Sequence, residues 1–270
     1  MLPAIPISPE LATRLAGNPL VVFLDIDGTL APIAPRPQDA RISPETLAVI
    51  EELVRLAAVH VVVVTGRSVS DARRLVPVSG TGMIGNHGLE ILGEDGSLII
   101  TPEAQSFRDA IRSAAWRLAD LATHHHGLVV EDKTWTLSVH YRLAERSAIP
   151  DVTATVATIA STLGLVVTRG KEVLELRPPT QVHKGTAVVD WAARLDALTP
   201  RASVVYMGDD RTDEDAFHAL RAAANHAVTL RVGEPEPSEA TNAEFGVETP
   251  EQATEFLAAL AAIRRPGGLA

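Results

Sequence analysis

Residues 20–32 read LVVFLDIDGTLAP, and they carry the strongest indication of the fold. The apolar run Leu20–Ile26 is rich in β-branched residues and is long enough for a strand buried on both faces, as in parallel sheets. Asp25 and Asp27 are two residues apart at its carboxyl end, so both carboxylates can project together at the edge where open α/β sheets bind ligands. Two adjacent carboxylates repel each other, and they stay ionised together only beside a cation such as Mg²⁺. The stretch therefore predicts a buried strand followed by a magnesium site.

The alternation of buried strands and amphipathic helices continues along the outer thirds of the chain. Two further apolar runs, Val59–Val64 and Ser203–Met207, predict strands. Ser43 and Pro44 are typical of a helix N-cap and first turn, and an apolar stripe at helical spacing predicts another helix over Lys184–Leu195. We therefore expect an α/β core of the Rossmann-like type, with a doubly wound, mainly parallel sheet.

The middle third of the chain follows a different pattern. A helical stripe ends near Gly127, and apolar and polar residues then alternate over Trp135–Tyr141, which is typical of a sheet with one packed and one open face. A second helical segment and further short strands follow. We therefore expect an α+β cap domain at 104–180, inserted into a core made of 1–103 and 181–270.

Composition and charge exclude several classes of protein. The 270 residues include 46% hydrophobic and 21% charged residues and no cysteine, which excludes disulfide scaffolds, thiolate nucleophiles and cysteine-based metal sites. The net charge of −10 argues against nucleic-acid binding. Residues 104–180 hold 9 Lys and Arg against 8 Asp and Glu, whereas the rest hold 15 against 26, which suggests that the inserted domain faces an anion. We find no signal peptide or membrane span and expect a cytoplasmic protein with no membrane partner.

Three other strand ends and helix starts carry residues suited to phosphoryl transfer. Thr65 follows the second strand and offers a hydroxyl to phosphate oxygens. Lys184 opens a helix and could neutralise both a nucleophile and a phosphate. Asp209 follows the strand over Ser203–Met207 and supplies a further metal ligand, with Asp210 and Asp213 in supporting positions. A single such residue is more often structural, but all of them together with the acidic pair favour a catalytic site.

These segments resemble the motifs of the haloacid dehalogenase-like superfamily, which match Asp25 and Asp27, Thr65, Lys184 and Asp209. The resemblance implies that Asp25 attacks phosphorus and forms an aspartyl-phosphate, while Asp27 protonates the leaving alcohol and later activates water. It also implies Mg²⁺ held by the three aspartates of these motifs. Charge balance agrees, because a dianionic phosphate cannot approach several carboxylates in a dry pocket without a metal and a lysine.

Further segments carry a narrower resemblance. They are Asp25–Pro32, Gly85–Gly88, Val130–Lys133, Leu137–Arg142, Leu174–Pro178, Lys184–Gly185 and Gly208–Phe217. In these segments the chain is similar to the trehalose-6-phosphate phosphatase family. The resemblance implies hydrolysis of trehalose 6-phosphate in trehalose biosynthesis and a functional pairing with trehalose-6-phosphate synthase.

Charged residues that alternate along the strands of the inserted domain could present donors and acceptors to a sugar. The family resemblance assigns sugar contacts to Glu131, Lys133 and Glu175. The full set of candidate substrate-binding residues is Arg67, Asn86, His87, Glu131, Lys133, Arg142 and Glu175. For Arg142 a structural ion pair is an equal alternative to substrate binding. For Arg67, Asn86 and His87, which belong to the predicted core domain, contact with phosphate or glucose stays open.

Two other features of the sequence look less informative for function. His124, His125 and His126 stand at a predicted helix end, where polar residues are ordinary, so we do not expect a metal site there. Trp116 and Trp135 fall in apolar stretches, and we expect both in the hydrophobic core.

Three alternative functions remain open from the sequence. The same chemistry could act on sucrose 6-phosphate or mannosyl-3-phosphoglycerate. A phosphomutase would use the same aspartyl-phosphate and return the phosphoryl group to sugar. A sugar-phosphate sensor would bind without turnover, but the presence of both Asp25 and Asp27 argues against it, since a sensor needs neither a nucleophile nor an acid.

Overall fold

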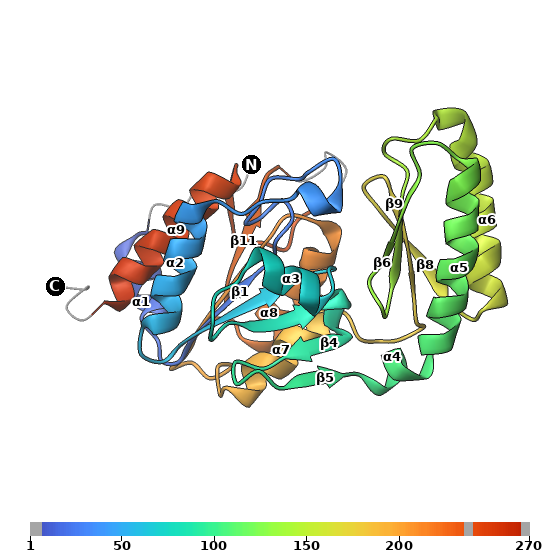
Figure 1. Ribbon diagram of the computed structural model, residues 1–270. Coiled ribbons are helices and arrows are strands. Elements are labelled where there is room, and N and C mark those ends of the chain that lie inside the picture. Colours follow the sequence, from blue (N-terminus) through green and yellow to red (C-terminus); the bar gives the residue numbers. More distant parts are fainter. Residues whose placement is uncertain (1–6, 235–239, 266–270) are drawn as a thin grey trace. The chain divides into compact units, whose positions relative to one another are not determined.

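The computed structural model describes residues 7–234 and 240–265, and the chain divides into two compact units. One unit comprises the residues up to Leu98 together with those from Val182 onward, and the other is Ile99–Gln181 (Figure 1). Within the described ranges, the first unit is built on an eight-stranded sheet and the second on a four-stranded sheet. Among the helices of these ranges, none has the length and hydropathy that a membrane span requires.

The larger sheet has the strand order β12-β11-β10-β1-β2-β3-β4-β5. Its strands are β1 (Leu20–Leu24), β2 (Val59–Val64), β3 (Gly82–Gly85), β4 (Glu90–Leu92), β5 (Leu98–Ile100), β10 (Ser203–Gly208), β11 (Val228–Val232) and β12 (Phe245–Val247). β1 is central and pairs in parallel with β2 and β10, with Val22 in register with Val61 and Val205. The β3–β4 pair is antiparallel. Because β1, β2 and β10 run parallel side by side, their carboxyl ends meet at one edge of the sheet.

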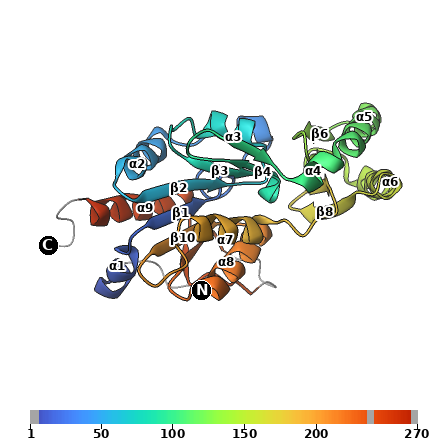
Figure 2. The ribbon, with the colours of Figure 1, turned by 90° about the horizontal axis from the view of Figure 1, so that it is seen from below.

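Helices cover both faces of this sheet (Figure 2). They are α1 (Pro9–Leu15), α2 (Pro44–Arg55), α3 (Val69–Leu75) and α9 (Pro250–Arg264) on one face, and α7 (Lys184–Arg194) and α8 (Arg211–Ala223) on the other. Two 3-10 turns, η1 (Pro37–Asp39) and η2 (Asn86–Gly88), lie in the connections. Leu20, Val22 and Leu24 pack into the first helical layer, whereas Val21 and Phe23 pack into the second. β1 is therefore buried on both sides, and the prediction of a doubly wound, mainly parallel sheet is confirmed.

The predicted starts of two helices are also found in the structure. α2 begins at Pro44, and the Ser43 side chain accepts a hydrogen bond from the N–H of Thr46 at 3.1 Å. α7 begins at Lys184 as expected. β1 ends two residues earlier than predicted, because the chain turns through Gly28, whose φ is +88°.

The smaller unit is an α+β unit with an antiparallel sheet of order β6-β7-β9-β8. Its elements are α4 (Pro102–Ser106), α5 (Arg108–His124), β6 (Val129–Asp132), β7 (Leu137–His140), η3 (Arg146–Ala148), α6 (Ile149–Thr162), β8 (Val166–Gly170) and β9 (Val173–Arg177). Val139 and Leu174 share one face of the sheet and join the core formed with α5 and α6. Glu131, Ser138 and Glu175 are in register with one another, so they lie on the opposite face.

The two tryptophans are not in the hydrophobic core, and that expectation was wrong. Trp116 is 76% exposed, whereas Ile111, Ala114 and Leu118 form the buried stripe of α5. Trp135 is only half-buried, and the guanidinium carbon of Arg108 lies 5.2 Å from the centre of its ring. Its ring therefore contacts the cation of Arg108.

Candidate active site

A buried ion pair connects the end of β1 to the start of α7. Lys184 Nζ donates to Asp25 Oδ1 at 2.8 Å and to Asp213 Oδ1 at 2.7 Å, and all three side chains are almost fully buried. The hydroxyl of Tyr206 on β10 also donates to Asp213 Oδ1, at 2.7 Å. Lys184 thus lies between two carboxylates that the sheet and two helices hold in place.

Burial and mutual repulsion shift the pKa values of these groups. Burial raises the pKa of Asp25 well above its ordinary value, and Lys184 offsets only part of this effect. Burial alone would lower the pKa of Lys184, but Asp213 and Asp25 outweigh it and raise the pKa well above its ordinary value. Lys184 is therefore a permanent cation that stabilises the ionised form of Asp25.

The three carboxylates of Asp25, Asp209 and Asp213 form a cluster that can hold a metal ion. One oxygen from each lies within 4.8 Å of the others. Burial, with help from Asp213 and Asp210, raises the pKa of Asp209 to about 8, so one lysine does not balance the cluster. A Cβ on Gly28 would lie 2.1 Å from Asp209 Oδ2, which explains the glycine. Hard oxygen donors with surplus negative charge fit Mg²⁺.

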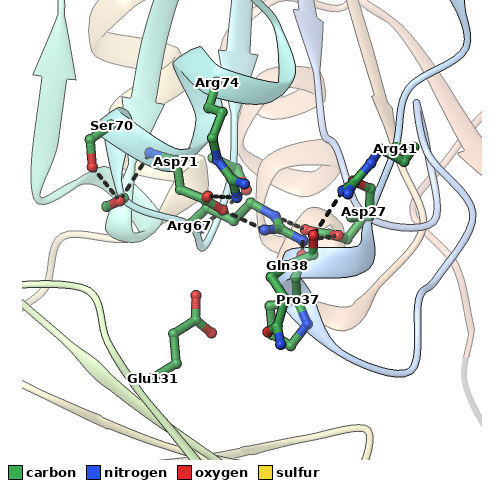
Figure 3. A network of polar contacts seen from close by, with 12 residues as sticks. Asp27, Pro37, Gln38, Arg41, Arg67, Ser70, Asp71, Arg74 and Glu131 are labelled. Atoms are coloured by element: carbon green, nitrogen blue, oxygen red, sulfur yellow. Dashed lines mark hydrogen bonds and ion pairs between the residues drawn. The ribbon is translucent and has the colours of Figure 1, made fainter.

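The structure places Asp27 outside this cluster, on the guanidinium of Arg67. Arg67 Nε donates to Asp27 Oδ2 and Arg67 Nη2 to Asp27 Oδ1, both at 2.6 Å (Figure 3). Thr65 is buried at the end of β2, and its hydroxyl accepts from the N–H of Arg67 at 3.1 Å. The carboxylate of Asp27 is thus paired with an arginine in this structure, and its role as a metal ligand stays a prediction.

Asn86 and His87 lie at the end of β3 in the left-handed backbone region, with φ of 47° and 56°. Asn86 Nδ2 donates to Glu90 Oε2 at 2.9 Å, and the same oxygen accepts from the N–H of Val69 at the start of α3 at 2.7 Å. The ring of His87 packs against Gly66, where an added Cβ would lie 2.5 Å from Nε2. Contact of either residue with substrate stays a prediction.

Charged side chains form ion pairs on the open face of the smaller sheet. Lys133 Nζ donates to Glu175 Oε1 at 3.0 Å, and Glu131 Oε2 lies at hydrogen-bond distance from His140 Nε2, at 3.0 Å. The Lys133–Glu175 pair is largely buried. Arg142 Nε donates to Glu172 Oε2 at 2.9 Å, which is the structural ion pair considered as an alternative to substrate binding. Their sugar contacts stay predictions.

Sequence reasoning named Asp213 as a supporting residue but missed Tyr206, whose hydroxyl donates to it. Asp213 is the N3 residue of α8, and its Oδ2 accepts from the N–H groups of Asp209 and Asp210 while Asp210 caps the helix, which is a capping box. The spacing of Asp210 and Asp213 was a signal for this motif. Tyr206 had no such signal, because it alternates along β10 like any core residue.

Metal affinity is expected to rise with pH. Burial and neighbouring aspartates raise the pKa of Asp209 to about 8 and that of Asp213 to about 6, so both lose protons between pH 6 and 8 and become better ligands. We expect Mg²⁺ affinity to increase at least about tenfold over this interval, with proton release. Titration calorimetry in two buffers of different ionisation enthalpy measures both.

The same pKa shifts determine whether the stability of the metal-free protein rises or falls with pH. Because the folded pKa values lie above the unfolded value of 3.8, the folded state binds more protons, and the free energy of unfolding in chelator falls as pH rises from about 4 to 8. A pH-independent Mg²⁺ affinity would contradict the assignment of these carboxylates as ligands.

The fold and the site together define a class of protein. A doubly wound parallel sheet, with an acidic residue after its central strand and a buried lysine beside it, places the chain among haloacid dehalogenase-like proteins. A family model described as trehalose-phosphatase matches residues 23–251. The chain belongs to the trehalose-phosphatase family.

Individual relatives agree with this assignment. A trehalose-phosphate phosphatase of Mycobacterium avium is 39% identical over 258 residues, which cover 93% of this chain and 64% of that protein. One of Mycobacterium tuberculosis is 34% identical over 256 residues, which cover 93% and 63%. The chain therefore spans less than two thirds of the length of these relatives.

Solved structures share the fold. The crystal structure of a trehalose-6-phosphate phosphatase related protein has a TM-score of 0.77 at 27% identity, and covers 88% of this chain and 95% of that one. The C-terminal domain of C. albicans trehalose-6-phosphate phosphatase has a TM-score of 0.74 at 21% identity, over 97% and 98% of the two chains. At that identity the second similarity concerns the fold alone.

Proposed function

We propose that this chain hydrolyses trehalose 6-phosphate to trehalose and inorganic phosphate. The observation that carries the proposal is the buried Lys184–Asp25 pair at the end of the central strand, in a chain of the trehalose-phosphatase family. Burial raises the pKa of Asp25, and Lys184 offsets part of this effect by favouring the ionised form of the carboxylate. A buried carboxylate held beside a fixed cation is suited to nucleophilic attack on a phosphate ester.

In the proposed reaction, Asp25 forms a bond to phosphorus as the bond from phosphorus to the sugar oxygen breaks. Asp27 gives its proton to that oxygen, and trehalose leaves. Asp27 then takes a proton from a water molecule, which attacks the aspartyl-phosphate, so that phosphate leaves and Asp25 is regenerated. Lys184 neutralises charge on Asp25 throughout.

The acidic cluster of Asp25, Asp209 and Asp213 is the proposed site for Mg²⁺. It shares Asp25 and Asp209 with the ligand set predicted from the sequence, in which Asp27 is the third ligand. When bound, the ion supplies positive charge that lets a phosphate dianion enter a site rich in carboxylates. Asp210 supports this site by capping α8. Despite burial, Lys184 and then hydrogen bonds hold the pKa of Asp210 below its ordinary value.

We further propose that residues Ile99–Gln181 act as the specificity cap and that the rest of the chain is the hydrolase core. The open face of the four-stranded sheet supports this role, because Glu131, Lys133 and Glu175 bring charged acceptors and donors together there. Charge-assisted hydrogen bonds to sugar hydroxyls are strong and geometrically selective. The proposal includes a functional pairing with a synthase that makes the substrate.

The experiment for specificity compares two esters in the same variants. Glu131→Gln and Glu175→Gln keep the size of each side chain but remove its charge. We expect kcat/KM for trehalose 6-phosphate to fall about tenfold to a hundredfold, because each variant weakens charge-assisted hydrogen bonds. With p-nitrophenyl phosphate, which has no sugar, the change should stay within about twofold.

Glu145→Gln serves as the control, because Glu145 is an exposed glutamate of the same unit. This variant should leave kcat/KM for both esters unchanged. Equal losses on both esters in the Glu131 and Glu175 variants would remove the specificity role. Release of trehalose and phosphate in equal amounts separates a phosphatase from a phosphomutase, which would form an isomeric sugar phosphate instead.

A further inference from the structure

Arg67 has every nitrogen of its guanidinium engaged by the protein. Nε and Nη2 hold the two oxygens of Asp27, Nη2 also donates to the carbonyl of Pro37 at 3.1 Å, and Nη1 donates to Asp71 Oδ2 (Figure 3). The side chain of Arg67 is only 6% exposed. A planar guanidinium that donates to both oxygens of a carboxylate fixes the position and the plane of that carboxylate. Arg67 is therefore aimed at Asp27 in this structure.

Asp71 anchors this arginine to a helix. It lies in the first turn of α3, four residues after Arg67, and its second oxygen accepts from Arg74. The start of α3 is itself fixed, since Ser68 caps the N–H of Asp71 at 3.2 Å and Glu90 accepts from Val69. The carboxylate of Asp71 thus has little freedom to move.

We propose that Asp71 and Arg67 are positioning residues that hold the carboxyl group of Asp27 where the leaving oxygen and the attacking water will lie. The inference rests on the proposed function, in which Asp27 transfers protons. Asp27 follows the end of β1, and its side chain is 39% exposed, so packing alone does not select its rotamer. The guanidinium supplies that selection, and Asp71 fixes the guanidinium. This assigns Arg67 to Asp27 rather than to the substrate.

Positioning and substrate binding predict different kinetics. A residue that binds substrate equally in the ground and transition states changes KM when it is weakened. A residue that places a proton-transfer group changes kcat, because a displacement of about 1 Å can cost about a hundredfold in rate. The proposal therefore predicts losses in kcat with little change in KM.

The main test uses Asp71→Asn, which preserves size but removes the charge that holds Arg67. We expect kcat to fall about tenfold or more, with KM within about twofold of wild type. Arg67→Lys is the second variant, because it keeps the charge and loses the planar guanidinium, and it should show the same pattern. Arg73→Gln is the control on the same helix and should retain wild-type kcat, since Arg73 is exposed. Thermal unfolding of each variant checks that it is folded.

Coupling to Asp27 separates positioning from a general structural effect. In an Asp27→Asn background there is no carboxylate to place, so Asp71→Asn should cause no further loss. A full additional loss in that background, or a raised KM with unchanged kcat, would overturn the proposal.

The choice of substrate keeps this test distinct from the test of the proposed function. The rate of the wild-type chain on trehalose 6-phosphate tests that function alone, and the coupling is then measured on whichever alkyl phosphate the chain hydrolyses. Failure on trehalose 6-phosphate with a coupled loss on another ester would overturn the substrate and support the positioning pair. A chain that hydrolyses no alkyl phosphate would overturn both.

Discussion

Replacing Asp25 with asparagine should abolish phosphate release while the fold is retained. Asparagine has nearly the same shape, but its amide is not a nucleophile toward phosphorus, so we expect kcat to fall at least about a thousandfold. The charge of Asp25 is penalised by burial, and Lys184 keeps its contact with Asp213 in the variant. The melting temperature should therefore not collapse. Phosphate release and thermal unfolding of the same preparation measure the two effects.

The matched control for this variant is Asp190→Asn, an exposed aspartate on α7 that should keep full activity. Comparable phosphate release by Asp25→Asn and wild type would remove Asp25 as the nucleophile. Retained binding of sugar phosphate by the inactive variant would show that the loss lies in chemistry and not in the fold.

Replacing Lys184 with alanine should cause both a loss of activity and a large loss of stability. Lys184 is the cation that contacts both Asp25 and Asp213, and its removal leaves two buried carboxylates without their partner. Breaking a buried pair in this way costs about 3–5 kcal/mol. Chemical denaturation in chelator measures the change in the free energy of unfolding. Arg117→Ala, at an exposed arginine, should change it by less than about 0.5 kcal/mol.

The loss caused by Lys184→Ala should depend on pH with a definite sign. Asp25 and Asp213 already have raised pKa values in the folded protein, and removing Lys184 raises them further. The folded state is then penalised once the unfolded carboxyls ionise, above their ordinary value of 3.8. The difference from wild type should therefore be small near pH 4 and should grow toward pH 8. A difference that does not change with pH would contradict this electrostatic origin.

The framework of the site could be predicted from sequence because it follows from local pattern. Asp25, Thr65 and Asp209 each follow the last residue of a strand, and parallel strands bring their carboxyl ends together. The position of Lys184 at the start of α7 was equally visible. The contact between Lys184 and Asp25 and the closeness of Asp25 to Asp209 follow from this topology.

Contacts between elements far apart in the sequence could not be predicted in the same way. The ion pair between Arg67 and Asp27 depends on how β1, β2 and α3 pack. Taken alone, the aspartate would suit a metal ion and the arginine would suit a phosphate. Asn86 is held by Glu90, whose place is fixed by the antiparallel β3–β4 pair. Side-chain pairing of this kind is set by tertiary packing and leaves no periodic signal.

The exposure of Trp116, in contrast, could have been predicted from the helical periodicity of α5. At about 100° per residue, Trp116 lies about 200° around the helix from both Ala114 and Leu118, which are buried. A tryptophan on that side of α5 must face outward. The expectation that Trp116 is buried rested on its hydrophobicity and not on its angular position around the helix.

The activity proposed for this chain is metal-dependent hydrolysis of trehalose 6-phosphate. The most direct test is phosphate release from trehalose 6-phosphate, sucrose 6-phosphate and glucose 6-phosphate, each with Mg²⁺ and with chelator. We predict a strong preference for trehalose 6-phosphate that disappears in chelator. Metal-dependent release with another preference would contradict the substrate, and no release from any of the three esters would contradict the phosphatase assignment and favour a sugar-phosphate sensor.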